Sequence, residues 1–282
     1  MPYIVLLIYL AIALALQLLA GDFPVAFFSF PLNIIAMLLW LGVMIWLWKT
    51  RRKSLFVSFM LSKGATVCAV SLFLIFCLVI GLTGIRSIAG TWIFVAFMLY
   101  FQTVLLFVIM RGWRAQTATG AHLGEIRWRF LLNHAGILIA VSSAFWGAPD
   151  SDTVRLQAFR DMPVREAIRM DGTGAWLPYE IELKDFKVET YENGVPAMYE
   201  ADMLIDGEPV TLKVNHPYSK GFGKNIYLTG YDAYAGEDSE YCVIQVVTEP
   251  WKYGAVAGIV LMLAGAMLLF AVGPKKRYWE DD

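Results

Sequence analysis

Apolar residues along the chain gather in six long runs separated by polar stretches. A helix of about 20 apolar residues can cross the hydrocarbon core of a bilayer, and a crossing segment must be helical to satisfy its own backbone. The pattern therefore predicts six transmembrane helices: Tyr3 to Ala20, Phe30 to Trp48, Ala65 to Leu82, Gly90 to Met110, Phe130 to Trp146 and Tyr253 to Val272. The fifth run could instead be a buried helix of a soluble domain, but its length and basic flank favour a crossing.

The stretch between the fifth and sixth runs alternates between apolar and polar residues, which is typical of β-strands. Tyr179, Ile181 and Leu183 follow one run of period two. Phe186 and Val188 follow a second run that is offset by one residue. This pattern predicts a strand with a bulge.

Turn signals divide this stretch into short strands. Glu192 to Gly194 and Asp206 to Pro209 contain the Asn-Gly and Asp-Gly pairs that favour hairpin turns. Residues 152–169 are polar with a few apolar positions, and we expect a short helix, or a strand and a turn, there. Together the signals predict about five to seven short strands, forming a small β-sandwich or an open barrel.

The expected fold is an integral membrane α-helical bundle with a small external β-rich domain inserted between the fifth and sixth helices. Residues 1–147 would form the five-helix region, 148–252 the β-rich domain, and 253–282 the last helix with a short tail. Composition agrees, because 58% apolar and only 17% charged residues cannot cover the surface of a soluble protein of this size. The first run lacks a basic start and is long for a signal core, so we expect it to be retained.

Basic residues predict the orientation, because Lys and Arg concentrate on the cytoplasmic side of membrane proteins. Twelve of them fall on one side of the predicted threading: Lys49, Arg51, Arg52, Lys53, Lys63, Arg111, Arg114, Arg127, Arg129, Lys275, Lys276 and Arg277. The short loops of the other side hold only Arg86. Both termini are therefore expected in the cytoplasm, with residues 148–252 outside.

Charge separates the expected external region from the rest of the chain. Residues 150–252 hold 19 acidic and 10 basic residues, a net charge of −9. Ordinary solubility explains such a charge, and steering of a basic partner is the alternative.

The cysteines form no disulfide framework. Cys68 and Cys77 lie in the third apolar run on opposite faces of a helix, and Cys242 stands alone in the external region. The chain contains no Cys-x-x-Cys-His, so it does not attach c-type haem to itself.

The external region resembles the outer domain of ResB-type (CcsB) cytochrome c biogenesis proteins. The resemblance runs over about residues 128 to 272 and includes the exit "VVTEPWKYG" into the last helix. Its markers are Leu177-Pro178, Leu183-x-x-Phe186, Tyr191-x-x-Gly194, Val214-Asn215-x-Pro217, Gly221 to Tyr227 and Tyr231-Asp232.

This resemblance implies a role in the two-component (System II) pathway that carries haem across the inner membrane and attaches it to apocytochrome c. The chain would be one subunit of a cytochrome c synthase and haem-export complex, and would make no covalent bond by itself. It implies a CcsA-type partner with a tryptophan-rich haem-binding loop. Because this sequence has no such loop, the partner is expected to be a separate chain. Nucleic acid is not expected as a partner.

Histidines are the residues expected to contact haem b, whose iron takes two axial ligands. His134 in the fifth helix is the axial-ligand candidate, since the family has a histidine in a corresponding helix. An interfacial histidine bonded to head groups or to Asn133, or a proton relay, are the alternatives. His122 would lie about 18 Å from His134 if the intervening residues were helical, so a second ligand from the partner is expected. His216 is a weak candidate, more typical of a turn residue.

Several other residues carry structural expectations. Asn215 and Pro217 form a corner, and Tyr227 and Tyr231 belong to the same structural or partner-contacting set. Three glycines are expected in turns: Gly221, Gly223 and Gly230. Four others are expected to permit close helix packing: Gly136, Gly254, Gly258 and Gly265. Four aromatic residues are expected in a membrane-interface belt, with haem stacking as the alternative: Trp128, Trp146, Trp251 and Tyr253. Cys242 is expected as a lone thiol, with redox contact to apocytochrome thiols as the alternative.

Two other functions fit the same sequence. The chain could be a membrane-anchored module whose external domain binds another protein without any haem role. It could also be a transporter of another substrate, although the near absence of charges inside the predicted helices disfavours an ion-coupled carrier. No catalytic triad, metal-ligand spacing or phosphate loop is present.

Overall fold

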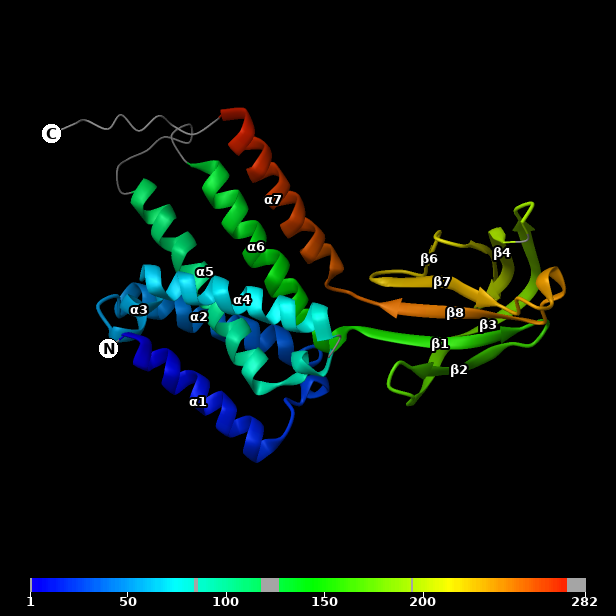
Figure 1. The fold of residues 1–282 in the computed structure, drawn as a ribbon, viewed down its shortest axis with the longest axis horizontal. Helices are drawn as coiled ribbons and strands as arrows, with labels where there is room; N and C mark the ends of the chain where they lie inside the picture. The colour runs from blue at the N-terminus through cyan, green and yellow to red at the C-terminus, as the bar shows by residue number, and fades with distance from the viewer. Residues whose placement is uncertain (1, 84–85, 118–126, 194, 273–282) are drawn as a thin grey trace. The chain divides into compact units, whose positions relative to one another are not determined.

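The computed structural model describes residues 2–83, 86–117, 127–193 and 195–272. The chain divides into two compact units, one formed by Met1–Pro149 with Lys252–Asp282 and the other by Asp150–Trp251. The first is helical and the second is built of strands (Figure 1).

All six predicted apolar runs are helical. The helices of the first unit are α1 (Pro2–Ala20), α2 (Leu32–Thr50), α3 (Leu55–Met60), α4 (Lys63–Thr83), α5 (Trp92–Thr117), α6 (Trp128–Gly147) and α7 (Lys252–Val272). Among the described residues, five of them are long and apolar enough to cross a membrane, namely α2, α4, α5, α6 and α7. In α1 the apolar stretch Leu6–Ala20 is shorter, so its crossing stays a prediction.

Large apolar side chains cover the outside of these helices. Leu19, Leu82 and Phe270 are 87%, 83% and 86% exposed. Exposed apolar surface on this scale is unfavourable in water and normal in lipid, so the helical unit is that of a membrane protein.

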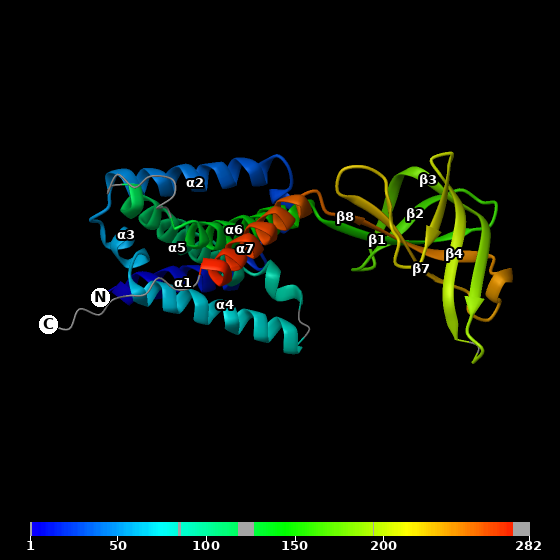
Figure 2. The same cartoon turned by 90° about the horizontal axis from the view of Figure 1, so that it is seen from above.

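α5 forms the centre of the helical unit. It packs with α6 between α2 on one side and α1 and α4 on the other (Figure 2). Buried aromatic side chains fill this centre, and the rings of Phe76 and Phe97 stack at 4.8 Å. The short helix α3 was not expected. Ser54 begins it by accepting a hydrogen bond from Val57 N at 3.3 Å, and α3 buries Val57 and Phe59 in the same core.

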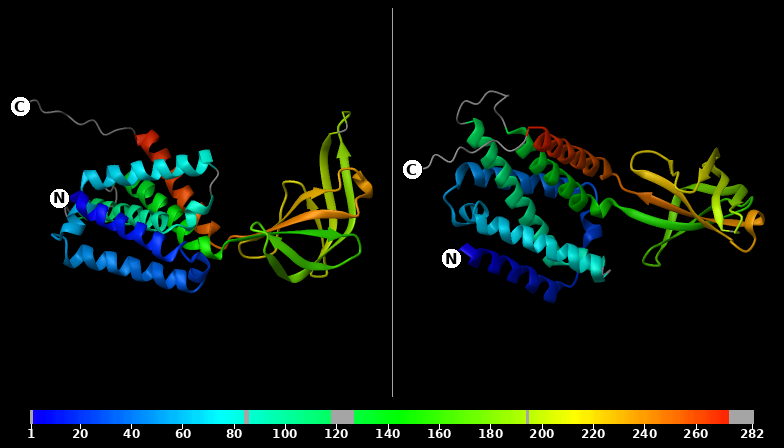
Figure 3. Two further views of the ribbon diagram at one scale, coloured as in Figure 1. Left: turned by 60° about the horizontal axis from the view of Figure 1, so that its bottom comes forward. Right: turned by 45° about the horizontal axis from the view of Figure 1, so that its top comes forward.

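α6 and α7 pack at backbone contact, as the glycine pattern predicted (Figure 3). A Cβ added to Gly136 would lie 2.6 Å from the carbonyl oxygen of Gly258. A Cβ on Gly265 would lie 2.8 Å from Asn133 Nδ2. Only residues without a side chain permit this approach.

The second unit is a single antiparallel sheet in the order β5-β4-β3-β2-β1-β8-β7-β6. Its strands are β1 (Asp152–Phe159), β2 (Val164–Arg169), β3 (Gly174–Thr190), β4 (Pro196–Ile205), β5 (Glu208–Lys213), β6 (Tyr218–Ser219), β7 (Lys224–Tyr231) and β8 (Tyr241–Thr248). The expected sandwich is therefore wrong, and the strand count of five to seven is too low. Residues 152–169 form two strands and a turn rather than a helix.

The sheet curls around one core, as an open barrel does. Leu212 of the edge strand β5 and Ile226 of β7, near the opposite edge, are both fully buried in the same hydrophobic cluster. A flat sheet could not bring both of them to one core, because six strands separate the two edges. Of the two predicted architectures, the open barrel is the one that the structure supports.

The predicted bulge is present in β3. Its pairing with β4 shifts register between Leu183 and Asp185, so that Leu183 and Phe186 both point into the core. The hairpin at Asp206-Gly207 is also confirmed, with φ of 57° and 79° at the two residues, as a type I′ turn requires. Gly194 of the other predicted turn lies outside the described residues.

Candidate functional site

His134 lies on the first half of α6 and is half-buried. Its Nδ1 lies 2.8 Å from the carbonyl oxygen of Phe130, one helical turn earlier. A carbonyl oxygen can only accept a hydrogen bond, so Nδ1 carries the proton and a neutral ring leaves its lone pair on Nε2. The ring also packs on Phe130, with centroids 4.1 Å apart.

This arrangement is the one that a metal-ligating histidine uses. In such sites the nitrogen that does not bind the metal usually donates to a backbone carbonyl or a carboxylate, which fixes the tautomer and the ring orientation. With the proton on Nδ1, a neutral His134 keeps on Nε2 a lone pair that can accept a hydrogen bond or bind a metal ion. Among the described residues, no group of three or more His, Cys, Asp or Glu side chains could hold a metal ion.

His134 and Asn133 face different surfaces of α6. Asn133 lies against Gly265 of α7 and donates from Nδ2 to Arg129 O at 2.8 Å. The alternative in which Asn133 binds the imidazole is therefore not what the structure shows. At about 100° per residue, His134 is roughly 200° from Gly136 and so faces away from α7. His122, the more distant histidine, lies outside the described residues.

An apolar cavity of about 550 Å³ lies at the opposite end of α6 from His134. Its walls are mostly apolar, and seven of the lining residues are aromatic: Phe23, Phe28, Trp40, Trp92, Phe94, Phe145 and Trp146. Trp92 Nε1 is buried there without a hydrogen-bond partner among the described residues. Twelve residues separate His134 from Trp146, which is about 18 Å along a helix axis.

Buried polar side chains hold the wall of this cavity in place. Gln102 Oε1 accepts from Trp146 Nε1 at 3.1 Å and from Ser142 Oγ at 2.8 Å. Asn33 Nδ2 donates to Trp146 O at 2.9 Å. Trp146 is only 9% exposed, so its expected place in an interfacial belt is wrong: its indole N–H is satisfied by Gln102 inside the helical unit.

The other aromatic residues of the expected belt differ from Trp146. Trp128 and Tyr253 are 41% and 47% exposed near the starts of α6 and α7, as belt residues would be. Trp251 belongs to the β-rich unit, where its Nε1 donates to Asp150 Oδ2 at 2.7 Å.

His216 and its neighbours form a corner after β5. His216 is exposed, and its backbone N–H donates to Lys213 O at 3.0 Å. Asn215 adopts φ of 63°, so it makes the turn through its backbone, and Pro217 follows. The geometry supports a turn role for His216.

The two tyrosines of the expected set have structural places. Tyr231 packs on Phe186 and Tyr199, with ring centroids 4.8 and 5.1 Å apart, against the core of the barrel. The hydroxyl of Tyr227 accepts from Asn225 Nδ2 at 3.3 Å. Of the glycines expected in turns, Gly221 and Gly223 adopt positive φ, whereas Gly230 lies in β7 at a register shift.

Cys242 is fully buried in the barrel core. Burial raises the pKa of its thiol to about 12, which keeps the thiol protonated and unreactive at neutral pH. Redox contact with a partner's thiols is therefore not supported. All three cysteines are free, as expected.

These features define a helical membrane protein with an antiparallel, barrel-like domain inserted between its last two long helices. Residues 126–239 match the sequence model of the ResB-like family. The resemblance to ResB-type proteins is thus confirmed, and it supports a role in cytochrome c biogenesis. The match covers His134 and most of the barrel, and it ends before the expected limit near residue 272.

A solved structure titled "Cytochrome c Heme Lyase CcmF" is similar at a TM-score of 0.41 and 14% sequence identity, over 70% of this chain and 33% of that one. This chain therefore spans about a third of the length of that protein. No curated protein sequence matches the chain.

Proposed function

We propose that this chain is a haem-handling subunit of a cytochrome c synthase and haem-export complex of the System II type. It would pass haem b across the inner membrane together with a CcsA-type partner and present it to apocytochrome c. The observation that carries this proposal is the geometry of His134, whose Nδ1 is fixed by Phe130 O and whose Nε2 is left with its lone pair.

One imidazole supplies one axial position, so the chain alone would hold haem weakly. The second ligand would come from the partner. Weak, shared ligation suits a carrier, because cargo that is bound too tightly is not released. Neither subunit alone would then be the ligase, and the covalent step would belong to the complex.

The aromatic cavity would be a second binding site for haem. A porphyrin is flat and apolar over most of its surface, and aromatic side chains stack on such rings. The cavity begins at Ala144, about 15 Å along α6 from His134, near the other end of the same helix. Haem would enter near His134 and leave near Trp146.

Orientation follows from the basic residues. Lys49, Lys53, Arg111 and Arg129 belong to the clusters that would stay in the cytoplasm, and this supports an external location of the barrel. The net charge of −9 on residues 150–252 would attract a basic partner, and an unfolded apocytochrome with exposed lysines is such a partner.

The experiment is complementation of a strain that lacks this chain. The wild-type chain should restore c-type cytochromes, whereas His134→Ala should restore less than about a tenth, because loss of an axial ligand removes the site. His216→Ala is the matched control and should behave as wild type. Normal maturation with His134→Ala, at equal protein levels, would contradict the proposal.

The alternative is a membrane-anchored extracytoplasmic interaction module with no haem role. This alternative rests on the barrel, whose surface could bind a partner protein without haem. In that case every His134 variant would support normal maturation, while changes on the barrel surface would not.

A further inference from the structure

The sheet of the barrel is split between β1 and β2. β1 pairs with β8 along its whole length. Against β2 it forms two pairs and, further on, one bridge: Val154 with Arg169, Arg155 with Ile168, and Phe159 with Met162. Between the second pair and the bridge the two neighbouring strands part.

β1 and β2 each have a second neighbour, β8 and β3, on the side away from the split. The hydrogen bonds on those sides show which backbone groups face the split. Arg160 N donates to Glu240 O at 2.9 Å, so even-numbered residues of β1 turn their backbone groups toward β8 and odd-numbered ones toward β2. Arg169 N donates to Thr173 O at 2.8 Å, so odd-numbered residues of β2 face β3 and even-numbered ones face β1.

The next hydrogen-bonded pair in this register would be Gln157 with Glu166. The ladder between the two strands, all of whose residues the structure describes, stops before that pair. The N–H and C=O groups of Gln157 and Glu166 therefore point into the split without a strand partner. Such groups form the template for β-strand addition.

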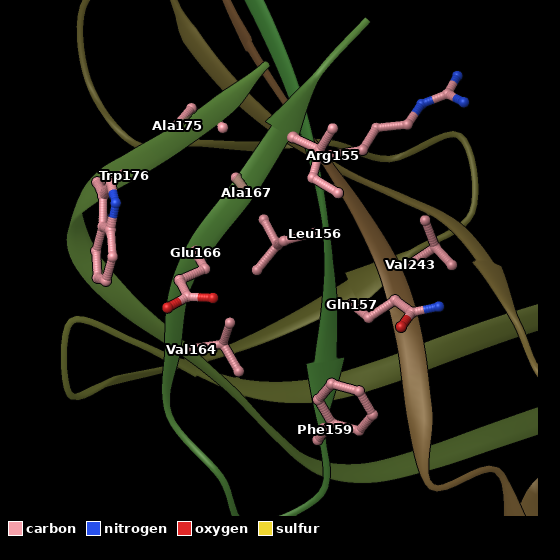
Figure 4. A pocket seen from close by; sticks show the side chains of 12 residues that line it. Arg155, Leu156, Gln157, Phe159, Val164, Glu166, Ala167, Ala175, Trp176 and Val243 are labelled. Carbon is pink, nitrogen blue, oxygen red and sulfur yellow. The ribbon is translucent and has the colours of Figure 1, made fainter. Parts of the chain in front are cut away.

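A cleft of about 610 Å³ occupies the split (Figure 4). Leu156 of β1 and Ala167 of β2 face each other across it, and small residues of β3, Gly174 and Ala175, leave room beside them. Trp176 stands on the rim and is 73% exposed. The lining is thus mostly apolar, with bare backbone along both sides.

Two charged side chains line the cleft, Arg155 and Glu166, and Arg155 Nε donates a hydrogen bond to Gln245 Oε1 at 3.0 Å. Glu166 lines the cleft and has no ion pair with any residue of the described ranges. The arginines on either side of it in sequence differ: Arg165 pairs with Glu180 at 3.1 Å, and Arg169 pairs with Asp152 at 3.1 Å. An unpaired carboxylate beside a hydrophobic surface favours a basic residue in whatever occupies the cleft.

We propose that this cleft binds an extended segment of unfolded polypeptide by strand addition. The split spans the four residue steps from Arg155 to Phe159, about 13 Å of strand, so it would pair with three or four residues. The segment would place apolar side chains beside Leu156 and Trp176 and a lysine or arginine at Glu166. This inference rests on the proposed function, which makes apocytochrome c the partner.

A polypeptide fits better than a flat or oily ligand for one physical reason. Haem or an acyl chain could cover the apolar lining but would leave the backbone groups of Gln157 and Glu166 unpaired, and buried unpaired backbone groups are costly. A strand satisfies both the lining and the backbone.

The test measures binding of a short synthetic peptide to the full-length chain in lipid nanodiscs without haem. The peptide carries a Cys-x-x-Cys-His segment with flanking lysines, and amide hydrogen exchange is followed in parallel. Peptide binding should slow exchange at Gln157 and Glu166. Glu166→Lys should weaken binding at least tenfold, whereas Glu192→Lys, the same charge change at an exposed position on the β3–β4 hairpin, should not.

A second variant fills the cleft without reversing a charge. A Cβ on Gly174 meets no atom within 4 Å, so Gly174→Phe should fold and should block the peptide. Equal affinity of the wild type and both cleft variants, or protection elsewhere in the chain, would overturn the proposal. The two proposals can fail separately. If the peptide binds as expected but deletion of the chain leaves c-type cytochromes intact, the result supports peptide binding in the cleft and contradicts the haem function.

Discussion

Gly136 of α6 and Gly258 of α7 touch backbone to backbone. A Cβ on either residue would lie 2.6 Å from the carbonyl oxygen of the other, closer than any real side chain allows. The same Cβ on Gly258 would lie 2.5 Å from Ala140 N. The two helices that bracket the barrel in sequence are therefore held as one pair by the absence of side chains.

Gly258→Leu should force these helices apart. Overpacking of a tight contact costs about 1–3 kcal/mol of the free energy of unfolding, because neither backbone can shift without losing its other contacts. Thermal unfolding in detergent should show a lower midpoint. Gly42→Leu is the control, since a Cβ at Gly42 meets nothing within 4 Å. Equal destabilisation by the two changes would argue against the tight α6–α7 contact.

Trp146→Phe should destabilise the wall of the aromatic cavity. It removes the indole N–H that Gln102 Oε1 accepts, and the loss of one buried hydrogen bond costs about 0.5–1.5 kcal/mol. Trp46→Phe is a fair comparison because Trp46 is 53% exposed. The two midpoints, measured in the same detergent, should differ, and identical values would mean that the Gln102 contact contributes nothing.

Cys242 should resist thiol reagents until the barrel unfolds. Its raised pKa, about 12, leaves almost no thiolate at neutral pH, and burial blocks access. Maleimide should label residue 242 only in denaturant. Tyr234→Cys, at a fully exposed position, should be labelled at once and serves as the positive control. Rapid native labelling of Cys242 would contradict the burial.

The same thiol should make the stability of the barrel depend on alkaline pH. The folded pKa of about 12 lies above the reference value of 9.0, so the unfolded chain releases this proton first. The contribution of Cys242 to the free energy of unfolding is therefore complete below about pH 9 and falls as the pH rises toward 12. Denaturant titrations of the wild type and Cys242→Ala should show a steeper alkaline loss in the wild type.

Local patterns explain the parts of this fold that the sequence predicts well. The bulge at Leu183 follows from an offset in alternation, and the turn at Asp206-Gly207 follows from two residues that tolerate positive φ. Gly136 and Gly258 were expected to permit close packing for a similar reason. His134 and Phe130 are one turn apart, so their contact also follows from helical spacing.

Long-range pairing explains the parts that the sequence misses. The split between β1 and β2 depends on where non-adjacent strands set their register, and Gln157 and Glu166 carry no local signal of it. From the sequence alone, Trp146 resembles a residue of the membrane-interface belt. The hydrogen bond that its indole N–H donates to Gln102, 44 positions earlier, appears only in the structure. The single curled sheet of eight strands depends on the same non-local contacts.

The visible spectrum of this chain purified together with the proposed CcsA-type partner tests the central claim most directly. The account predicts a low-spin, bis-histidine Soret band that His134→Gly abolishes and that added imidazole restores, because the small ligand takes the place of the missing side chain. A Soret band that is unchanged in His134→Gly, or a colourless wild-type pair, would contradict the role of His134 as an axial ligand.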